Sequence, residues 1–151
     1  MPRGQRIAIW LAITSVAAVL ALGGWFAFQV MSAFNGTLGV SCDEAARFFR
    51  AAELPAGARD RKCTTGQWMS ISYELDFRAQ KEEAEAWLRT SYPGTELSRG
   101  FCGHADACAD PKQDPVPFTD QDGHRLADSV AVQLTYEESG VAHVRMSGST
   151  V

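Results

Sequence analysis

The chain has 151 residues, a formal net charge of −4 and 46% hydrophobic residues. This length allows one domain of about 120 residues after an N-terminal segment, large enough to bury a core. No cluster of Lys and Arg follows Arg6, which argues against nucleic acid as a partner, because a phosphate backbone is bound through clustered basic side chains.

An uncharged apolar segment from Ile7 to Val30 follows a short N-terminus of residues 1–6. As a helix it spans about 36 Å, enough to cross a hydrocarbon core of about 30 Å. Arg3 and Arg6 precede it, and the first charge beyond it is Asp43. Positive charge stays on the cytoplasmic side, so we expect a single-pass signal-anchor in the cell membrane. The bilayer is its partner, residues 1–6 are cytoplasmic, and the C-terminal part is extracytoplasmic.

A cleaved signal peptide is the alternative interpretation of this segment. Its hydrophobic region would be about 7–15 residues long and followed by small residues. The apolar run here is longer, and Trp25, Phe26 and Phe28 stand where small residues are required. Cys42 lies well beyond the run and follows Leu-Gly-Val-Ser, a poor match to a lipid-attachment site. A retained anchor is therefore favoured.

Four cysteines in an oxidising compartment predict two disulfides, and three pairings are formally open. We favour Cys42 with Cys63, because a helix followed by a return loop between them would bring the chain back and place the two cysteines close together. Cys102 then pairs with Cys108 and closes the loop FCGHADAC.

The loop between Cys102 and Cys108 contains His104 and Asp106, which suggest a metal site. Ligands on alternate residues do not easily surround one tetrahedral ion, because structural zinc uses pairs about two to four residues apart plus a distant second pair. Cys63 and His124 are the residues that would have to complete the set. Disulfides are the default, and we expect no cofactor.

The outer domain, residues 42–151, follows a tether of residues 31–41. The segment CDEAARFFRAAEL is predicted to be a helix with acids in its first turn, ended by Pro55 and Gly57. Gln67 to Phe77 alternates with a period of two, which predicts a strand with one buried and one wet face. The next segment, RAQKEEAEAWLRTSYPG, is predicted to be a second helix with this inner stripe: Ala84, Trp87, Leu88 and Tyr92.

From Gly94 to Asp128 the sequence shows neither helical nor strand periodicity, which predicts a long loop held by the disulfide between Cys102 and Cys108. A D-x-D-G motif in this loop resembles the middle of a calcium loop. Phe118 and Ser129 stand where an EF-hand requires carboxylates, so a simple turn is predicted. Alternation then returns in a C-terminal hairpin, residues 130–137 and 141–146.

These elements predict an α+β fold, in which an N-terminal transmembrane helix precedes a two-layer domain. The order α-β-α-β-β gives an antiparallel sheet of three to four strands with two helices on one face. Thr95 to Phe101 is the candidate for the fourth strand.

The sequence contains no G-x-S-x-G motif of a nucleophilic hydrolase, no Gly-rich phosphate-binding loop and no C-x-x-C redox motif. Glu74 and Asp76 share the wet face of the predicted strand without an obvious cleft, and His143 is expected to be an ordinary surface histidine. Trp68, on the same face, is a candidate partner anchor. We favour the alternative that the long loop covers it.

The first predicted helix, the phrase LPAGARDRKC, the strand SYELDF and the segment AEAWL together resemble small envelope proteins of high-GC bacteria. Such proteins are membrane-anchored or lipid-anchored and of unknown function. The resemblance covers roughly Cys42 to Leu88 and implies a fold and a compartment, without an activity to transfer.

The leading hypothesis is a membrane-anchored extracytoplasmic module, non-enzymatic, that binds an envelope protein or a cell-wall ligand. Trp68, His104 and Asp106 are its candidate partner-binding residues. The alternative is a small extracytoplasmic metal-dependent enzyme or metal-binding protein that uses His104, Asp106 and His124.

Overall fold

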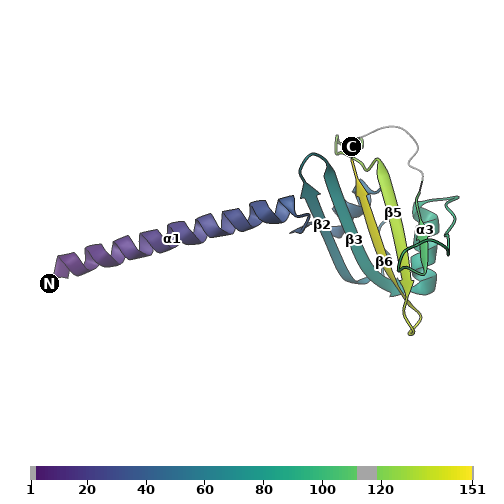
Figure 1. Cartoon of the computed structure of the whole chain (residues 1–151), viewed down its shortest axis with the longest axis horizontal. Coiled ribbons are helices and arrows are strands. Elements are labelled where there is room, and N and C mark those ends of the chain that lie inside the picture. Colours follow the sequence, from purple (N-terminus) through teal and green to yellow (C-terminus); the bar gives the residue numbers. More distant parts are fainter. Residues whose placement is uncertain (1–2, 112–118, 151) are drawn as a thin grey trace.

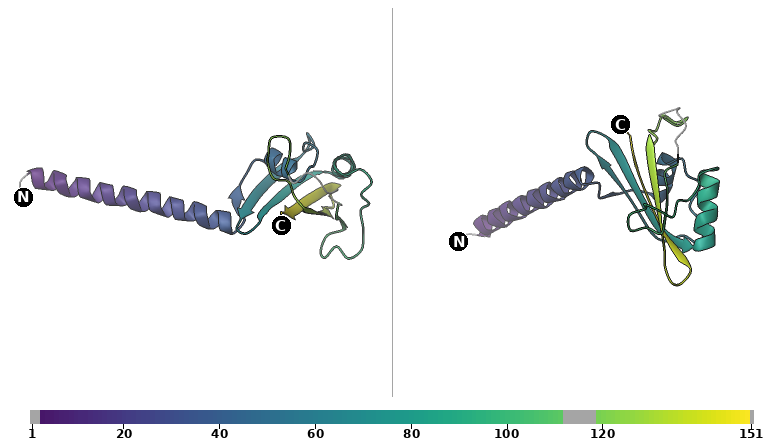
Figure 2. Two further views of the ribbon diagram at one scale, coloured as in Figure 1. Left: turned by 90° about the horizontal axis from the view of Figure 1, so that it is seen from above. Right: turned by 45° about the vertical axis from the view of Figure 1, so that its right-hand side comes forward.

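A long N-terminal helix projects from a small domain in the computed structural model, which describes residues 3–111 and 119–150. This helix, α1 (Arg3–Phe34), extends away from the rest of the chain like a rod (Figure 1, Figure 2). Within it, the 23 residues Trp10–Ser32 are long and apolar enough to cross a membrane, and the domain buries none of the 18-residue window that meets this criterion. Within the described ranges, this is the one helix that meets the criterion. The helix also continues into the expected tether.

The domain is built on a six-stranded antiparallel sheet with the strand order β1-β2-β3-β6-β5-β4. The strands are β1 (Leu38–Gly39), β2 (Arg59–Gln67), β3 (Ile71–Gln80), β4 (Ala107–Ala109), β5 (Ser129–Tyr136) and β6 (Val141–Ser149). The α+β class is confirmed. The expected three to four strands are wrong, as is the expected order of elements, because β1, β2 and β4 lack the alternation that identifies a strand.

The β2–β3 hairpin replaces the single strand expected from Gln67 to Phe77. Gln67 ends β2, residues 68–70 form the turn, and β3 continues three residues beyond Phe77. The start of β2 is rich in charged residues that strands disfavour. It also contains a bulge, where Asp60 takes a left-handed φ of 52°.

Two helices cover one face of the sheet: α2 (Cys42–Phe48) and α3 (Lys81–Ser91). Ser41 caps α2 by accepting a hydrogen bond from the Glu44 amide at 3.1 Å. This helix ends earlier than the expected Pro55 because Arg50 adopts a left-handed φ of 58°.

The core lies between these helices and the inner face of the sheet. Phe48 of α2 stacks on Tyr73 at 4.3 Å between ring centroids, and Trp87 of α3 meets Phe77 edge-on at 5.2 Å. Since Tyr73 and Phe77 are four residues apart on β3, both helices contact the same face. The largest fully buried side chains are Phe49, Phe77, Leu75, Leu134, Met146, Val132 and Val144. The expected inner stripe of the second helix is also buried.

The segment between α3 and β5 contributes an edge strand in place of the predicted loop. Ala107–Ala109 pairs with β5, whereas the expected strand Thr95 to Phe101 supplies one isolated bridge, from Ser98 to Cys108. Residues 112–118, including Pro115, Pro117 and Phe118 of the expected loop, lie outside the described residues.

Both disulfides join the favoured partners. Cys42 at the start of α2 pairs with Cys63 on β2, and Cys102 pairs with Cys108 on β4. The first therefore ties a helix to a strand 21 residues away, and the second closes a separation of six residues.

The two bridges should differ in their effect on stability. Cys42→Ser/Cys63→Ser should lower the free energy of unfolding by about 3 kcal/mol and Cys102→Ser/Cys108→Ser by about 2 kcal/mol, because the longer loop constrains the unfolded chain more. Urea unfolding of the full chain in detergent micelles, followed by near-ultraviolet circular dichroism, measures both. A larger loss in the second variant would contradict this account.

Gly148 on β6 should not tolerate a side chain. A Cβ there would lie 2.5 Å from the Ser129 carbonyl oxygen and 2.9 Å from the Phe49 ring. We expect Gly148→Ala to cost about 1–3 kcal/mol through overpacking. Gly39→Ala on β1 is the matched control, since its Cβ would meet nothing within 4 Å. Equal stability of the two variants in thermal unfolding would contradict the packing described.

Candidate functional site

The outer face of the sheet, opposite α2 and α3, is polar. Along β3 and β6 its side chains alternate with those of the core. They are Ser72, Glu74, Asp76, Arg78, His143, Arg145, Ser147 and Ser149. In the part of the chain that the structure describes, neither α2 nor α3 packs on this face.

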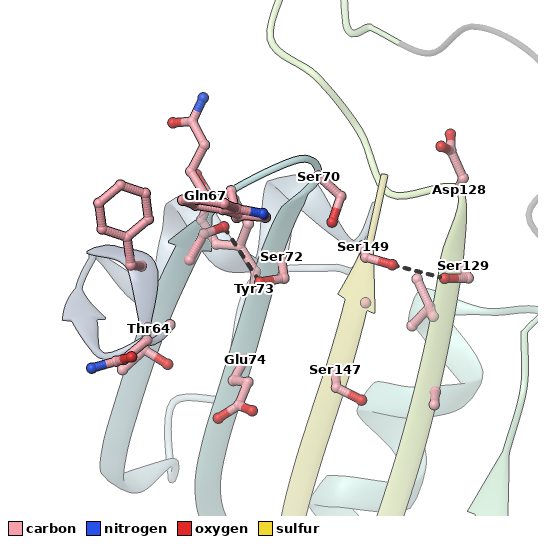
Figure 3. A pocket seen from close by; sticks show the side chains of 18 of the residues that line it. Thr64, Gln67, Ser70, Ser72, Tyr73, Glu74, Asp128, Ser129, Ser147 and Ser149 are labelled. Atoms are coloured by element: carbon pink, nitrogen blue, oxygen red, sulfur yellow. Dashed lines mark hydrogen bonds between the residues drawn. The ribbon is translucent and has the colours of Figure 1, made fainter. Parts of the chain in front are cut away.

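A cavity of about 780 Å³ lies on the outer face, beside the end of α1. Its six serine and threonine hydroxyls come from Thr64, Ser70, Ser72, Ser129, Ser147 and Ser149, and its carboxylates from Glu74, Asp110 and Asp128. Figure 3 shows hydroxyl side chains of β3, β5 and β6 on the same side of the sheet. Phe34 and Trp68 line the cavity next to α1. None of its described lining residues is basic.

The outer face of the sheet carries small side chains at this cavity. Gly66 lies beneath the chain that leaves α1, and a Cβ on it would be 2.7 Å from the Gly36 Cα. The Ser72 hydroxyl donates to the Gly66 carbonyl at 3.3 Å, and the hydroxyls of Ser129 and Ser149 lie 3.5 Å apart. A hydroxyl has one donor and two acceptor positions. These serines therefore keep hydrogen-bonding capacity for a ligand.

A second cavity of about 290 Å³ continues the first, because Thr64 and Glu74 line both. It adds Lys62, Asp76 and Arg145. We call the two cavities together the outer-face trough. The first cavity is acidic, and the far end of the trough carries both signs of charge.

Asp76 links two basic residues, His143 and Arg145, at the far end of the trough. His143 Nε2 and Asp76 Oδ1 form a hydrogen bond at 2.6 Å, and Arg145 Nε donates to Asp76 Oδ2 at 3.4 Å. His143 is thus a half-buried, paired residue, and the expectation of an ordinary surface histidine is wrong. Among the described residues, no hydroxyl or thiol bonds to His143. The pair therefore lacks the nucleophile that a catalytic triad requires.

Trp68, the candidate partner anchor, lies in the turn of the β2–β3 hairpin. Its side chain is 73% exposed, and its ring meets Phe34 edge-on at 4.9 Å. The expectation that the long loop covers it is wrong for the part of that loop that is described.

His104 and Asp106 lie in the turn before β4, at the sheet edge opposite β1. His104 is exposed, while Asp106 accepts a hydrogen bond from the Tyr136 amide at 2.6 Å and so fastens this turn to β5. His124 instead lines a separate cavity of about 740 Å³ beside α2. No group of three His, Cys, Asp or Glu residues in the described ranges could hold a metal ion. The structure thus does not bring the three expected ligands together.

The D-x-D-G motif forms the predicted turn. Asp120 Oδ1 accepts hydrogen bonds from the amides of Asp122 and His124, and Gly123 takes a positive φ of 83°. This carboxylate therefore stabilises its own loop.

All three tyrosines of the chain bear phenols that resist ionisation. Burial, together with the hydrogen bond that the hydroxyl donates to Glu44, raises the pKa of Tyr73 to about 12. Burial raises the pKa of Tyr92 above its usual value, and burial with Glu85 raises the pKa of Tyr136. Folding therefore stabilises the neutral, protonated form of all three phenols.

No protein-family model, curated protein or solved structure matches this chain. The fold and the site alone define its class: an α+β domain with one helix-covered face and one open polar face, joined to an apolar N-terminal helix.

Alkaline pH should unfold the domain through its tyrosines. A raised pKa means that stability is fully present below pH 10.0 and, for Tyr73, is lost as the pH rises toward about 12. Absorbance titration of tyrosinate should show no ionisation near pH 10 in the native chain and three phenols ionising there in concentrated urea. Tyr73→Phe should remove one of these three. A native step near pH 10 would contradict the burial described.

Proposed function

We propose that this chain is a membrane-anchored binding module whose domain lies outside the cytoplasm. Three observations support this: the exposed apolar span of 23 residues, the positive charges at Arg3 and Arg6 before it, and two disulfides in the domain. Disulfides persist in oxidising compartments, and Arg residues flank the cytoplasmic end of a span. In this proposal α1 crosses the cell membrane once.

The binding site of the proposal is the outer-face trough. The observation that carries it is the cavity of about 780 Å³ on an otherwise solvated sheet face. Its volume falls within the range of about 300–1,000 Å³ that is typical of ligand sites. Globular domains normally pack such a face or leave it flat, so a hollow lined with hydrogen-bonding groups favours a ligand.

The chemistry of the lining indicates the class of ligand. Three carboxylates, with no basic side chain among the described lining residues, favour a group that carries positive charge. The six hydroxyls suit a partner with several hydrogen-bonding groups. We therefore propose an amine-bearing polar ligand. Two envelope components have this chemistry: a lysine-containing segment of a protein, and an amino sugar of the cell wall.

The metal-dependent alternative has no comparable support. His104 and His124 line different parts of the domain, and Asp106 bonds to the β5 backbone. The geometry of the described residues therefore favours binding over metal chemistry.

Glu74→Gln should weaken the binding of a cationic ligand. The probes are pentalysine and a glucosamine oligosaccharide, with pentaglutamate as the charge control, added to the full chain in nanodiscs. We expect at least one cationic probe to bind, and Glu74→Gln to lower its affinity about tenfold, as the loss of one charge-assisted hydrogen bond. Isothermal titration calorimetry measures both affinities.

Glu138→Gln is the matched control, because Glu138 is an exposed carboxylate in the β5–β6 turn, outside the trough. Equal weakening by this control, or no more binding of the cationic probes than of pentaglutamate, would overturn the proposal. Binding of pentalysine alone would indicate a protein partner, and binding of the oligosaccharide alone a cell-wall partner.

A further inference from the structure

We infer that the tip of the β2–β3 hairpin, Trp68 and Met69, is a second membrane contact. The structure assigns it to the headgroup region of the outer leaflet, beside the end of α1. This inference rests on the proposed crossing of the membrane by α1, and it names the lipid surface as the partner of the hairpin.

The hairpin tip exposes large apolar side chains that the domain core does not use. Trp68 is 73% exposed and Met69 is 89% exposed. On α1, Phe28, Met31 and Phe34 are also exposed, and the Phe34 ring meets Trp68. The tip therefore continues the apolar surface of the span, and lipid is the solvent that suits such a surface.

The depth of the tip follows from its contact with α1. The apolar span ends at Ser32, and Phe34 lies two residues further, about 3 Å along the helix axis. The Phe34 and Trp68 rings are 4.9 Å apart between centroids. Trp68 thus sits at the membrane–water boundary, where Trp is favoured because an apolar ring and a polar N–H meet lipid and water together.

The junction between α1 and the domain keeps the hairpin at this level. The Gly36 backbone lies directly on Gly66 of β2, at a distance that excludes a Cβ. The Thr37 amide donates to the Ser32 carbonyl at 2.9 Å, which continues the end of the helix into β1. Figure 1 shows α1 ending beside β2, and Figure 2 shows the same junction from two further directions.

The residues around the tip match a headgroup environment. Gln67 and Ser70, which flank Trp68 and Met69, are exposed and uncharged. They can hydrogen-bond to headgroups and water, and they avoid the cost of moving a charge toward lipid. The domain is therefore held by two contacts, which fix its tilt and place the wall of the trough that Trp68 lines beside the bilayer surface.

The four tryptophans of the chain allow a test with internal controls. Trp10 and Trp25 lie on α1, Trp68 is at the tip, and Trp87 is buried in the core. The full chain, labelled with 5-fluorotryptophan, is placed in nanodiscs that contain a lipid with a nitroxide at the top of its acyl chain. Fluorine NMR then gives one signal for each tryptophan, assigned by single Trp→Phe variants.

We expect the Trp68 signal to lose intensity as strongly as the Trp25 signal does, while the Trp87 signal persists. Loss at Trp10 and Trp25 with a persistent Trp68 signal would overturn the hairpin contact and leave the anchor intact. Persistence of all four signals would overturn the anchor and the hairpin contact together.

A matched pair of variants tests the role of the aromatic contact. Phe34→Ala removes the ring that Trp68 meets, whereas Phe28→Ala removes an exposed ring further inside the span. We expect the Trp68 signal to regain intensity in the first variant and to stay quenched in the second. An equal response in both would show that α1 does not hold the hairpin in the way described.

Discussion

The antiparallel pairing of β3 with β6 is the constraint on which the rest of the domain depends. It joins residues 71–80 to 141–149 and sets Leu75 opposite Met146 on the inner face. The same register sets Asp76 opposite Arg145 on the outer face. A shift of one residue would exchange the two faces. The hydrophobic core and the polar trough are therefore two consequences of one register, and burial on the inner side fixes the chemistry of the outer side.

β2 pairs with β3 on the side away from β6, and its first residues add little to the core. Residues 59–62 are all exposed and all charged, and a bulge interrupts their pairing with β3. Few apolar side chains hold β2 against the core, so the covalent link from Cys63 to Cys42 takes over part of that role. The trough wall at Thr64 and the hairpin tip at Trp68 both follow Cys63 closely. A disulfide thus stabilises the strand that presents the proposed contacts.

Local patterns predicted the elements whose burial alternates, the apolar N-terminal helix and the two disulfide pairs. The faces of β3, β5 and β6 and the inner stripe of α3 follow from periodicity. In a strand every second residue points to the same face, and in a helix every third or fourth residue does. β2 and β4 gave no such signal, since charged and small residues form them. The hydrogen bond between His143 and Asp76 was also not predicted, although both residues were expected on solvent-facing sides of their strands. Their proximity requires β6 to lie beside β3, and no local pattern encodes strand order.

Trp68 belongs to both proposed contacts, which constrains how the trough works. It lines the trough and also meets Phe34 at the end of α1, whereas two of the trough carboxylates, Asp110 and Asp128, lie next to β4 and β5 across the sheet. If the hairpin tip lies in the headgroup region, the wall of the trough at Trp68 is close to lipid, and the carboxylates next to β4 and β5 lie further from it. The far end, with Lys62 and Arg145, faces water and is screened by salt. A ligand with one amine should therefore place that amine at the carboxylates and its less polar part against Trp68, because opposite charges attract and the indole ring is largely apolar.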